Sequence, residues 1–335
     1  MTDLEVIDMH CHLQRDPAHG QEMRDYFLGR HLVKPGATNL GTLSEFKELM
    51  AACGISAMNA LMLTWSGRYH RDGQYTFPDD YAERASSEAE LRARVSRRIT
   101  DNNDWAAAVA ADHPEVTYFA GVNPIVMGAQ EAAAEVARQR SRGALGVKLS
   151  PADIGVTGSD PAFFPIYEFC VAHDYPVLTE TGGHNPACRP AGFAGALAAY
   201  PRLPLVFAHF GHDRTLGGPL DQEVLELART HDNVYTDTSL RLNEVYDGTI
   251  SPEDMVKHLR MLGIERAMFG SNYVFCDVLN TRPGHVAAPD DVDARFTQVW
   301  KSVQVLKTLP LTDDERAGLA AGNFKRLTGY DRTRS

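Results

Sequence analysis

Two histidines separated by a single residue stand at the end of an apolar run near the N-terminus. The run covers residues 6–12 and ends in His10 and His12. Side chains alternate between the two faces of a strand, so a strand here points both imidazoles to one face and Met9 to the other, into an outer layer. Two imidazoles on one face are suited to hold a divalent metal ion. The spacing therefore predicts a metal site in which His10 and His12 are ligands.

Polar or ionisable side chains also end several other short apolar segments of the chain. These residues are Lys148, Glu180, His209, Asp237 and Asn272. Burying one such group without a partner costs roughly 2 to 7 kcal/mol, so groups that recur at one end of buried strands are expected to converge on an ion or a polar ligand. We therefore expect one site built from several strand ends.

The residue types suggest roles within such a site. Lys148 could bind a substrate carboxylate or pair with Glu180, and the sequence leaves both alternatives open. His184 and Arg241 follow the fifth and seventh apolar segments, where either could contact an acidic substrate. Histidine has an unperturbed pKa near neutrality, which suits His209 to proton transfer.

The elements that must position these residues alternate along the chain. Short β-branched segments alternate with longer helical patterns, which is typical of βα units and a parallel sheet. Eight such units in one chain argue for a closed (β/α)8 barrel of class α/β, in a single domain over residues 1–335. The predicted strands are Glu5–His12, Ile55–Thr64, Thr117–Asn123, Ala144–Ser150, Pro176–Thr181, Leu205–Phe210, Val234–Ser239 and Ala267–Asn272. Helical patterns between them include Glu88–Asp112, Ala129–Arg142, Phe163–His173, Leu220–His231 and Pro252–Leu262.

Two stretches depart from this rhythm and are predicted as insertions after strands one and two. They are Gln14–Leu43, rich in Gly, Arg and His, and Thr64–Ala85, which is rich in aromatic residues. Both would follow the C-terminal end of a strand, which is the face where such barrels carry their sites. We expect them to cover the mouth of the barrel as a lid or substrate wall.

Composition excludes several classes of partner. The net charge of −11 and the pI of about 5.6 offer no basic surface for nucleic acid or an anionic membrane. The first residues lack a basic stretch, and no apolar run approaches the roughly 20 residues that span a bilayer, so we expect a cytoplasmic protein. The five cysteines are far apart, which predicts reduced, buried thiols.

Five segments resemble one known family over nearly the whole chain. The chain is similar to the amidohydrolase superfamily, specifically the branch related to aminocarboxymuconate semialdehyde decarboxylase. The resemblance implies a (β/α)8 barrel, one divalent metal ion, a small-molecule substrate and a homodimer. Zinc is the first expectation for the metal, with manganese or iron as alternatives. The matching segments are Ile7–His12, Gly146–Pro151, Leu205–Gly211, Met268–Tyr273 and Glu315–Leu327.

Two departures from the family pattern touch the metal site. The family's fifth strand ends in a histidine ligand where this chain has Glu180, and its eighth strand supplies a catalytic aspartate where this chain has Asn272. We predict that Glu180 takes over as the carboxylate ligand beside the two histidines. An amide cannot accept a proton at neutral pH, so Asn272 in the catalytic position cannot perform the family's proton transfer unchanged. His209 is the favoured replacement, with Glu180 and Asp277 as alternatives.

Three functions follow from these observations. The first is a metal-dependent hydrolase of a small amide or lactone that uses metal-activated water. The second is a non-oxidative decarboxylase of an aromatic or unsaturated carboxylic acid. The third is a metal-free lactonase, cyclase or binding protein on the same barrel, suggested by Glu180 and Asn272.

Overall fold

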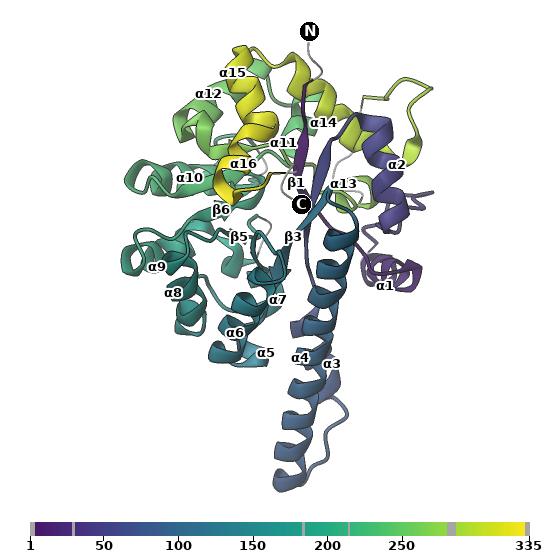
Figure 1. Ribbon diagram of the computed structural model, residues 1–335. Helices are drawn as coiled ribbons and strands as arrows, with labels where there is room; N and C mark the ends of the chain where they lie inside the picture. Colours follow the sequence, from purple (N-terminus) through teal and green to yellow (C-terminus); the bar gives the residue numbers. More distant parts are fainter. Residues whose placement is uncertain (1–3, 29–30, 183–184, 214, 280–285, 332–335) are drawn as a thin grey trace.

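Eight parallel strands form one sheet in the order β1 to β8 (Figure 1). The computed structural model describes residues 4–28, 31–182, 185–213, 215–279 and 286–331. The first and last strands also meet, because Met9 N donates to Phe269 O at 3.0 Å and a parallel bridge joins Cys11 to Tyr273. The strands are β1 (Ile7–Cys11), β2 (Ala57–Leu61), β3 (Val116–Gly121), β4 (Gly146–Leu149), β5 (Val177–Thr179), β6 (Leu205–Phe207), β7 (Val234–Asp237) and β8 (Ala267–Met268). The predicted (β/α)8 barrel is confirmed.

Helices surround this barrel and alternate with its strands (Figure 1). Each of the five helical patterns expected from the sequence is found, and α12 has the expected bounds. The α-helices are α1 (Pro17–Leu28), α2 (Leu43–Cys53), α3 (Ser66–Gln74), α4 (Tyr81–Asp112), α5 (Pro124–Met127), α6 (Ala129–Arg140), α7 (Pro151–Ile154), α8 (Phe164–Ala172), α9 (Ala194–Ala199), α10 (Pro219–Thr230), α11 (Arg241–Tyr246), α12 (Pro252–Leu262), α13 (Phe275–Val278), α14 (Thr297–Thr308), α15 (Asp313–Ala317) and α16 (Asn323–Thr328).

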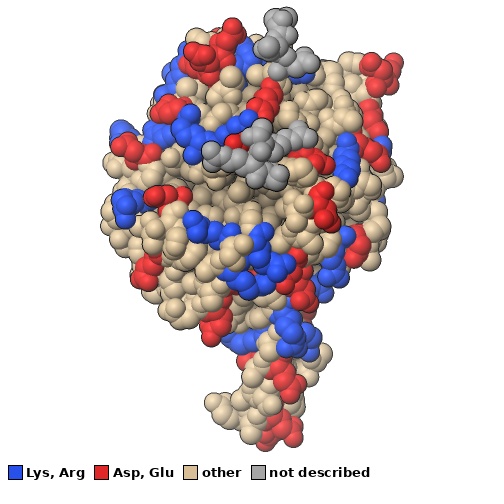
Figure 2. All heavy atoms as spheres, viewed as in Figure 1, with Lys and Arg blue, Asp and Glu red and all other residues tan. Residues whose placement is uncertain are grey.

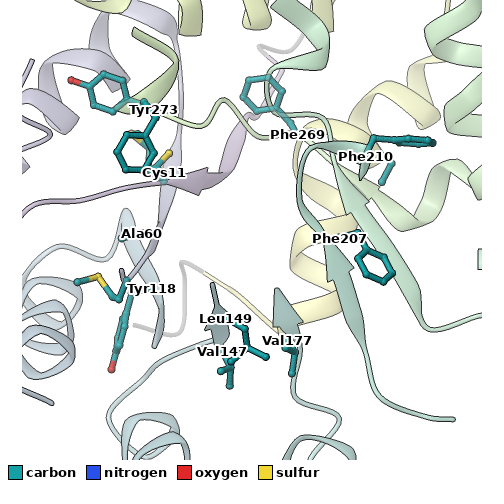
Figure 3. Packing of buried hydrophobic residues seen from close by; sticks show 14 of the residues in the cluster. Cys11, Ala60, Tyr118, Val147, Leu149, Val177, Phe207, Phe210, Phe269 and Tyr273 are labelled. Carbon is teal, nitrogen blue, oxygen red and sulfur yellow. The ribbon is translucent and has the colours of Figure 1, made fainter. Parts of the chain in front are cut away.

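Apolar side chains pack in two layers, one on each face of the strands. The larger cluster lies between the strands and the surrounding helices, and it includes Val147, Val177 and Phe207 (Figure 3). The smaller cluster collects the alternating residues of the same strands inside the barrel, such as Leu178 and Val206. Because alternate side chains are buried on both faces, the strands read as nearly continuous apolar runs.

Met9 belongs to the inner cluster, so its predicted place in the outer layer was wrong. The pairing of β1 with β2 shifts register between Asp8 and Cys11, where the ladder is irregular. An irregularity of this kind interrupts the strict alternation of faces along a strand. Met9 and the two histidines after it therefore all face the inside of the barrel, while Cys11 packs outside with the larger cluster.

The two insertions lie after β1 and β2 and are joined to each other. The hydroxyl of Tyr69, on α3, donates to Glu22 on α1 at 2.5 Å. Beyond this contact, α3 and the first half of α4 project from the barrel as a helical arm (Figure 1). Tyr75 and Tyr81 are exposed at the tip of the arm. The second predicted insertion, Thr64–Ala85, therefore points away from the barrel and does not cover its mouth as a lid would.

Helix α4 extends into the arm because it begins well before the pattern predicted for it. Its first residue is Tyr81, and the side chain of Asp80 accepts hydrogen bonds from two backbone N–H groups of the first turn. The five cysteines are free and buried, as expected. Among the residues with described positions, no helix combines the length and apolarity that crossing a membrane requires.

Candidate metal centre

The imidazoles of His10 and His12 face each other at the C-terminal end of β1. Their Nε2 atoms are 3.3 Å apart, and the Nε2 atom of His12 is 3.1 Å from Oδ1 of Asn272. All three side chains are buried. The two histidines thus share one face, and Asn272 from the segment after β8 joins them.

These distances fit a metal ion bound by the two imidazoles. Nitrogen ligands at 2.0 to 2.1 Å from a tetrahedral zinc ion lie about 3.3 to 3.4 Å from each other. The Nδ1 atom of His12 is buried and has no hydrogen-bond partner among the described residues. Burial lowers the pKa of both His10 and His12, which favours the neutral imidazole that binds metal.

Asp237, the last residue of β7, orients the imidazole of His10 by contacting Nδ1, on the side of the ring opposite Nε2. Its Oδ2 atom is 2.8 Å from His10 Nδ1, so the imidazole donates from Nδ1 and leaves Nε2 free for a ligand. Burial alone would raise the pKa of Asp237, but its interactions with His10, His209 and Ser239 hold that pKa well below its usual range. Asp237 is therefore a carboxylate that fixes the tautomer of His10, a predicted metal ligand.

Asp237 also holds His209 through Ser239. The Nδ1 atom of His209 is 2.6 Å from Ser239 Oγ, which in turn donates to Asp237 Oδ1. The backbone N–H of His209 donates to the same carboxylate oxygen at 3.1 Å. With its Nδ1–H directed at Ser239, His209 keeps Nε2 as an acceptor.

The backbone at His209 and Asn272 is left-handed, with φ of 60° and 67°. Residues other than glycine rarely adopt this backbone conformation, and those that do cluster at functional sites. The turn is held by backbone hydrogen bonds, including one from Asn272 N to His10 O at 2.8 Å. Strands β6 and β8 therefore end earlier than predicted, before these bends. The bends direct the side chains of His209 and Asn272 into the barrel.

A second group of possible ligand atoms overlaps the first. Atoms of His10, His209 and Asp237 lie within 4.8 Å of one another. In this group the Asp237 carboxylate already accepts bonds from His10, Ser239 and backbone N–H groups. The pair of Nε2 atoms on His10 and His12 is the better candidate for a metal, and Asp237 then serves as its supporting carboxylate.

Lys148 and Glu180 come from neighbouring strands. Lys148 on β4 is buried, and burial lowers its pKa while the charge of Glu180 opposes that shift. Glu180 follows β5, is half-buried, and has a pKa raised by burial and opposed by Lys148. Within the described residues, Glu180 forms no ion pair with Lys148 and no hydrogen bond to His10 or His12, so its role as a metal ligand stays a prediction.

Arg241 begins α11, after β7, and is fully buried. Its guanidinium pairs with Asp221 and, at 2.9 Å, with Glu244, and it donates to the carbonyl oxygen of His209 at 3.3 Å. The guanidinium of Arg241, which was expected to contact substrate, is thus already paired within the protein. These contacts indicate that Arg241 holds the loop after β6 in place. His184, the other predicted contact of this kind, lies outside the described residues.

Sequence reasoning placed Asp237 at a strand end without giving it a role, and it missed Ser239. The structure brings both to His10 and His209. Their spacing carried a usable signal, because residues two apart on a strand share a face.

Comparison with known proteins agrees with the barrel. A family model described as Amidohydrolase matches residues 7–327. A search of curated proteins found no match.

Several solved structures share the fold. The 5-carboxyvanillate decarboxylase LigW of Sphingomonas paucimobilis is 17% identical with a TM-score of 0.65, covering 98% of this chain and 100% of that one. A dihydroxybenzoic acid decarboxylase of Polaromonas, with bound manganese and the inhibitor 2-nitroresorcinol, is 14% identical with a TM-score of 0.62 and covers 97% of each chain. A probable 2-pyrone-4,6-dicarboxylic acid hydrolase of Acinetobacter baumannii is 12% identical with a TM-score of 0.56, covering 97% of this chain and 100% of that one. At these identities the likeness concerns the fold.

Proposed function

Because the chain belongs to the amidohydrolase family, we propose that it is a metal-dependent, non-oxidative decarboxylase of a small aromatic or unsaturated carboxylic acid. The observation that carries this proposal is the buried amino group of Lys148 in the same barrel as the facing imidazoles of His10 and His12. An ammonium group and a metal site within one barrel suit a carboxylate substrate. Two of the similar structures named above are decarboxylases, which adds support.

In this proposal His10 and His12 hold the metal, with Asn272 beside them and Glu180 as the added carboxylate ligand. A bound divalent ion would supply Lewis-acid stabilisation of negative charge on the substrate. Zinc, manganese and iron all accept such a ligand set. Asp237 keeps His10 in the tautomer that leaves Nε2 for the metal.

Lys148 is proposed to bind the carboxylate and to deliver the proton. Loss of carbon dioxide leaves an electron pair on the substrate carbon, which must take up one proton. Burial lowers the pKa of Lys148, which makes its ammonium group a stronger acid, while the charge of Glu180 opposes that shift. In this proposal Nζ carries the proton when substrate binds and is reprotonated from solvent after each turnover.

One observation favours hydrolysis of a small amide or lactone as the second candidate. The chain of hydrogen bonds from Asp237 through Ser239 to His209 leaves Nε2 of His209 as an acceptor. Burial also lowers the pKa of His209 well below its usual value, so the imidazole is neutral and suited to take a proton from water. In a hydrolase His209, rather than Lys148, would move the essential proton.

Product analysis with metal-loaded protein separates the two candidates. We expect carbon dioxide release from a panel of hydroxybenzoates and unsaturated acids, and a loss of about 10²- to 10⁴-fold in turnover for Lys148→Gln with unchanged metal content. Lys257→Gln on the exposed face of α12 is the control. Ring opening of lactones without carbon dioxide release, abolished by His209→Gln but retained by Lys148→Gln, would establish the hydrolase instead.

The remaining expectations are part of the same proposal. We propose a small-molecule substrate, a homodimer and a cytoplasmic location.

A further inference from the structure

The outer part of the helical arm, residues 71–90, has no core of its own. All of these residues have described positions, and none of them is buried. The buried residues of α4 begin only at Leu91. Helices in proteins are stabilised mostly by packing against other elements, and short helices without such packing are marginal in water. The first turns of α4 therefore present an exposed face that is open to a partner.

The inner end of the arm is fixed to the barrel. Asp153, on α7, accepts hydrogen bonds from the backbone N–H groups of Gly67 and Arg68 at the start of α3, at 2.8 and 3.1 Å. On the other helix of the arm, Arg98 pairs with Glu22 of α1 at 2.7 Å. Both helices are thus held at the base, which reduces the ordering that a partner would have to impose.

Charge is divided along the arm. Its outer part, residues 72–90, carries six acids and a single basic residue, Arg84. Its inner part, residues 66–71 and 91–98, carries six arginines and no acid. Figure 2 shows acidic side chains on the outer part of the arm and basic side chains where the arm meets the barrel. The arm thus has a negative outer half and a positive inner half.

One edge of the exposed face of α4 repeats this division. Residues spaced by three, four or seven positions lie on the same side of an α-helix. Four exposed charged residues follow this spacing, and none of their side chains forms an ion pair with a described residue. They are Glu83, Glu90, Arg94 and Arg97.

A line of small residues runs beside this edge. They follow one another at spacings of four, three and four positions, and all are exposed. The distance between two packed helices depends on the side chains at the contact, so small residues allow a close approach. The small residues are Ala82, Ser86, Ala89 and Ala93.

We propose that the arm is a dimerisation surface, on which the arms of two copies of this chain lie side by side and antiparallel. The acidic outer half of each arm then lies against the basic inner half of the other, whereas a parallel or tip-to-tip pairing would place like charges together. A two-fold axis between Ser86 and Ala89 places Glu83 of each copy within one turn of Arg94 of the other copy. This proposal names the surface of the homodimer proposed above and does not depend on the chemistry at the metal centre.

Charge reversal tests the proposal through the dissociation constant of the dimer, measured by analytical ultracentrifugation. The parent should sediment as a dimer. Arg94→Glu with Arg97→Glu should raise the dissociation constant by about tenfold or more, because acids then face acids. Glu83→Arg with Glu90→Arg should have the same effect, because bases then face bases.

Mixing the two double variants distinguishes lost pairing from lost folding. Every acid faces a base again in the mixed pair, so a heterodimer of near-parent affinity should form. Arg202→Glu with Arg229→Glu, at exposed positions outside the arm, is the control pair and should leave the dissociation constant unchanged. A monomeric parent, double variants with parent affinity, a mixture that stays monomeric, or a control pair that weakens the dimer equally would overturn the proposal.

Cross-linking locates the interface independently. The five native cysteines are buried, so a short bismaleimide should react at an introduced thiol. Ala89→Cys should yield covalent dimers, whereas Thr230→Cys, at an exposed position on α10, should not. A dimer that Ala89→Cys leaves without a cross-link would place the interface elsewhere and contradict the proposal. None of these measurements uses turnover, so their failure would leave the proposed decarboxylase untouched.

Discussion

His10 and Asp237 are joined by a hydrogen bond of 2.8 Å between Nδ1 and Oδ2, although 227 positions separate them in the chain. The bond links the first strand to the seventh across the inside of the barrel. It gives one of the predicted metal ligands a fixed tautomer, and it gives His209 an anchor through Ser239.

Removal of this carboxylate should weaken metal binding. Asp237→Asn keeps the size of the side chain but loses the charge that orients His10, and we expect metal affinity to fall by about 10- to 100-fold. Competition with a chromophoric chelator measures the metal affinity of the parent and the variant. Asp232→Asn, at an exposed position just before β7, is the control. Equal affinities for the parent and the Asp237 variant would show that this bond is not a support for the metal.

Exchange of the carboxylate position tests the ligand set. Glu180→Gln should lose metal affinity severely, because two neutral imidazoles and two amides would remain around a divalent ion. Asn272→Asp should bind more tightly, without a necessary gain in turnover, since the added charge makes the ion a weaker Lewis acid. Glu180→His combined with Asn272→Asp should restore affinity that Glu180→His alone has lost. Unchanged affinity in Glu180→Gln would exclude Glu180 as a ligand and favour the metal-free function.

Asp277 should make stability depend on pH. Burial raises its pKa to about 6 from 3.8, although the backbone N–H of Gln298 and the charge of Lys34 oppose the shift. Between these two values the folded protein holds a proton that the unfolded chain has released, so the free energy of unfolding falls as pH rises from 4 to 6, by up to about 3 kcal/mol.

The variant Asp277→Asn removes this titration. It keeps an oxygen to accept from Gln298 N, so its stability relative to the parent should rise between pH 4 and pH 7. Urea unfolding across this range measures the difference, with Asp290→Asn, at an exposed position, as the control. Parallel pH curves for the parent and Asp277→Asn would contradict the expectation.

Arg241 should matter for stability more than for substrate affinity. Arg241→Met leaves the fully buried carboxylate of Asp221 without its main partner, which we expect to cost about 3 to 5 kcal/mol. Arg260→Gln, which breaks an exposed pair with Glu315, should change stability little. Adding Asp221→Leu to Arg241→Met should recover much of the loss. A raised KM with unchanged stability would instead support the predicted contact with substrate.

The amino-acid sequence by itself determined the barrel and the strand ends at which the candidate site lies. Eight apolar segments alternating with helical patterns leave few other folds, and polar residues at the ends of buried segments must find partners. The His-x-His spacing was sufficient to place His10 and His12 on one face. These properties are local, so they can be read along the chain.

Only the tertiary structure decided which polar groups meet. The irregular pairing of β1 turned Met9 inward, and the left-handed backbone at His209 and Asn272 set where two strands stop. The fully buried pairing of Arg241 and the support of His10 by Asp237 each join residues from different elements. Strand order and register fix such contacts, because they depend on distances across the barrel that no local spacing encodes.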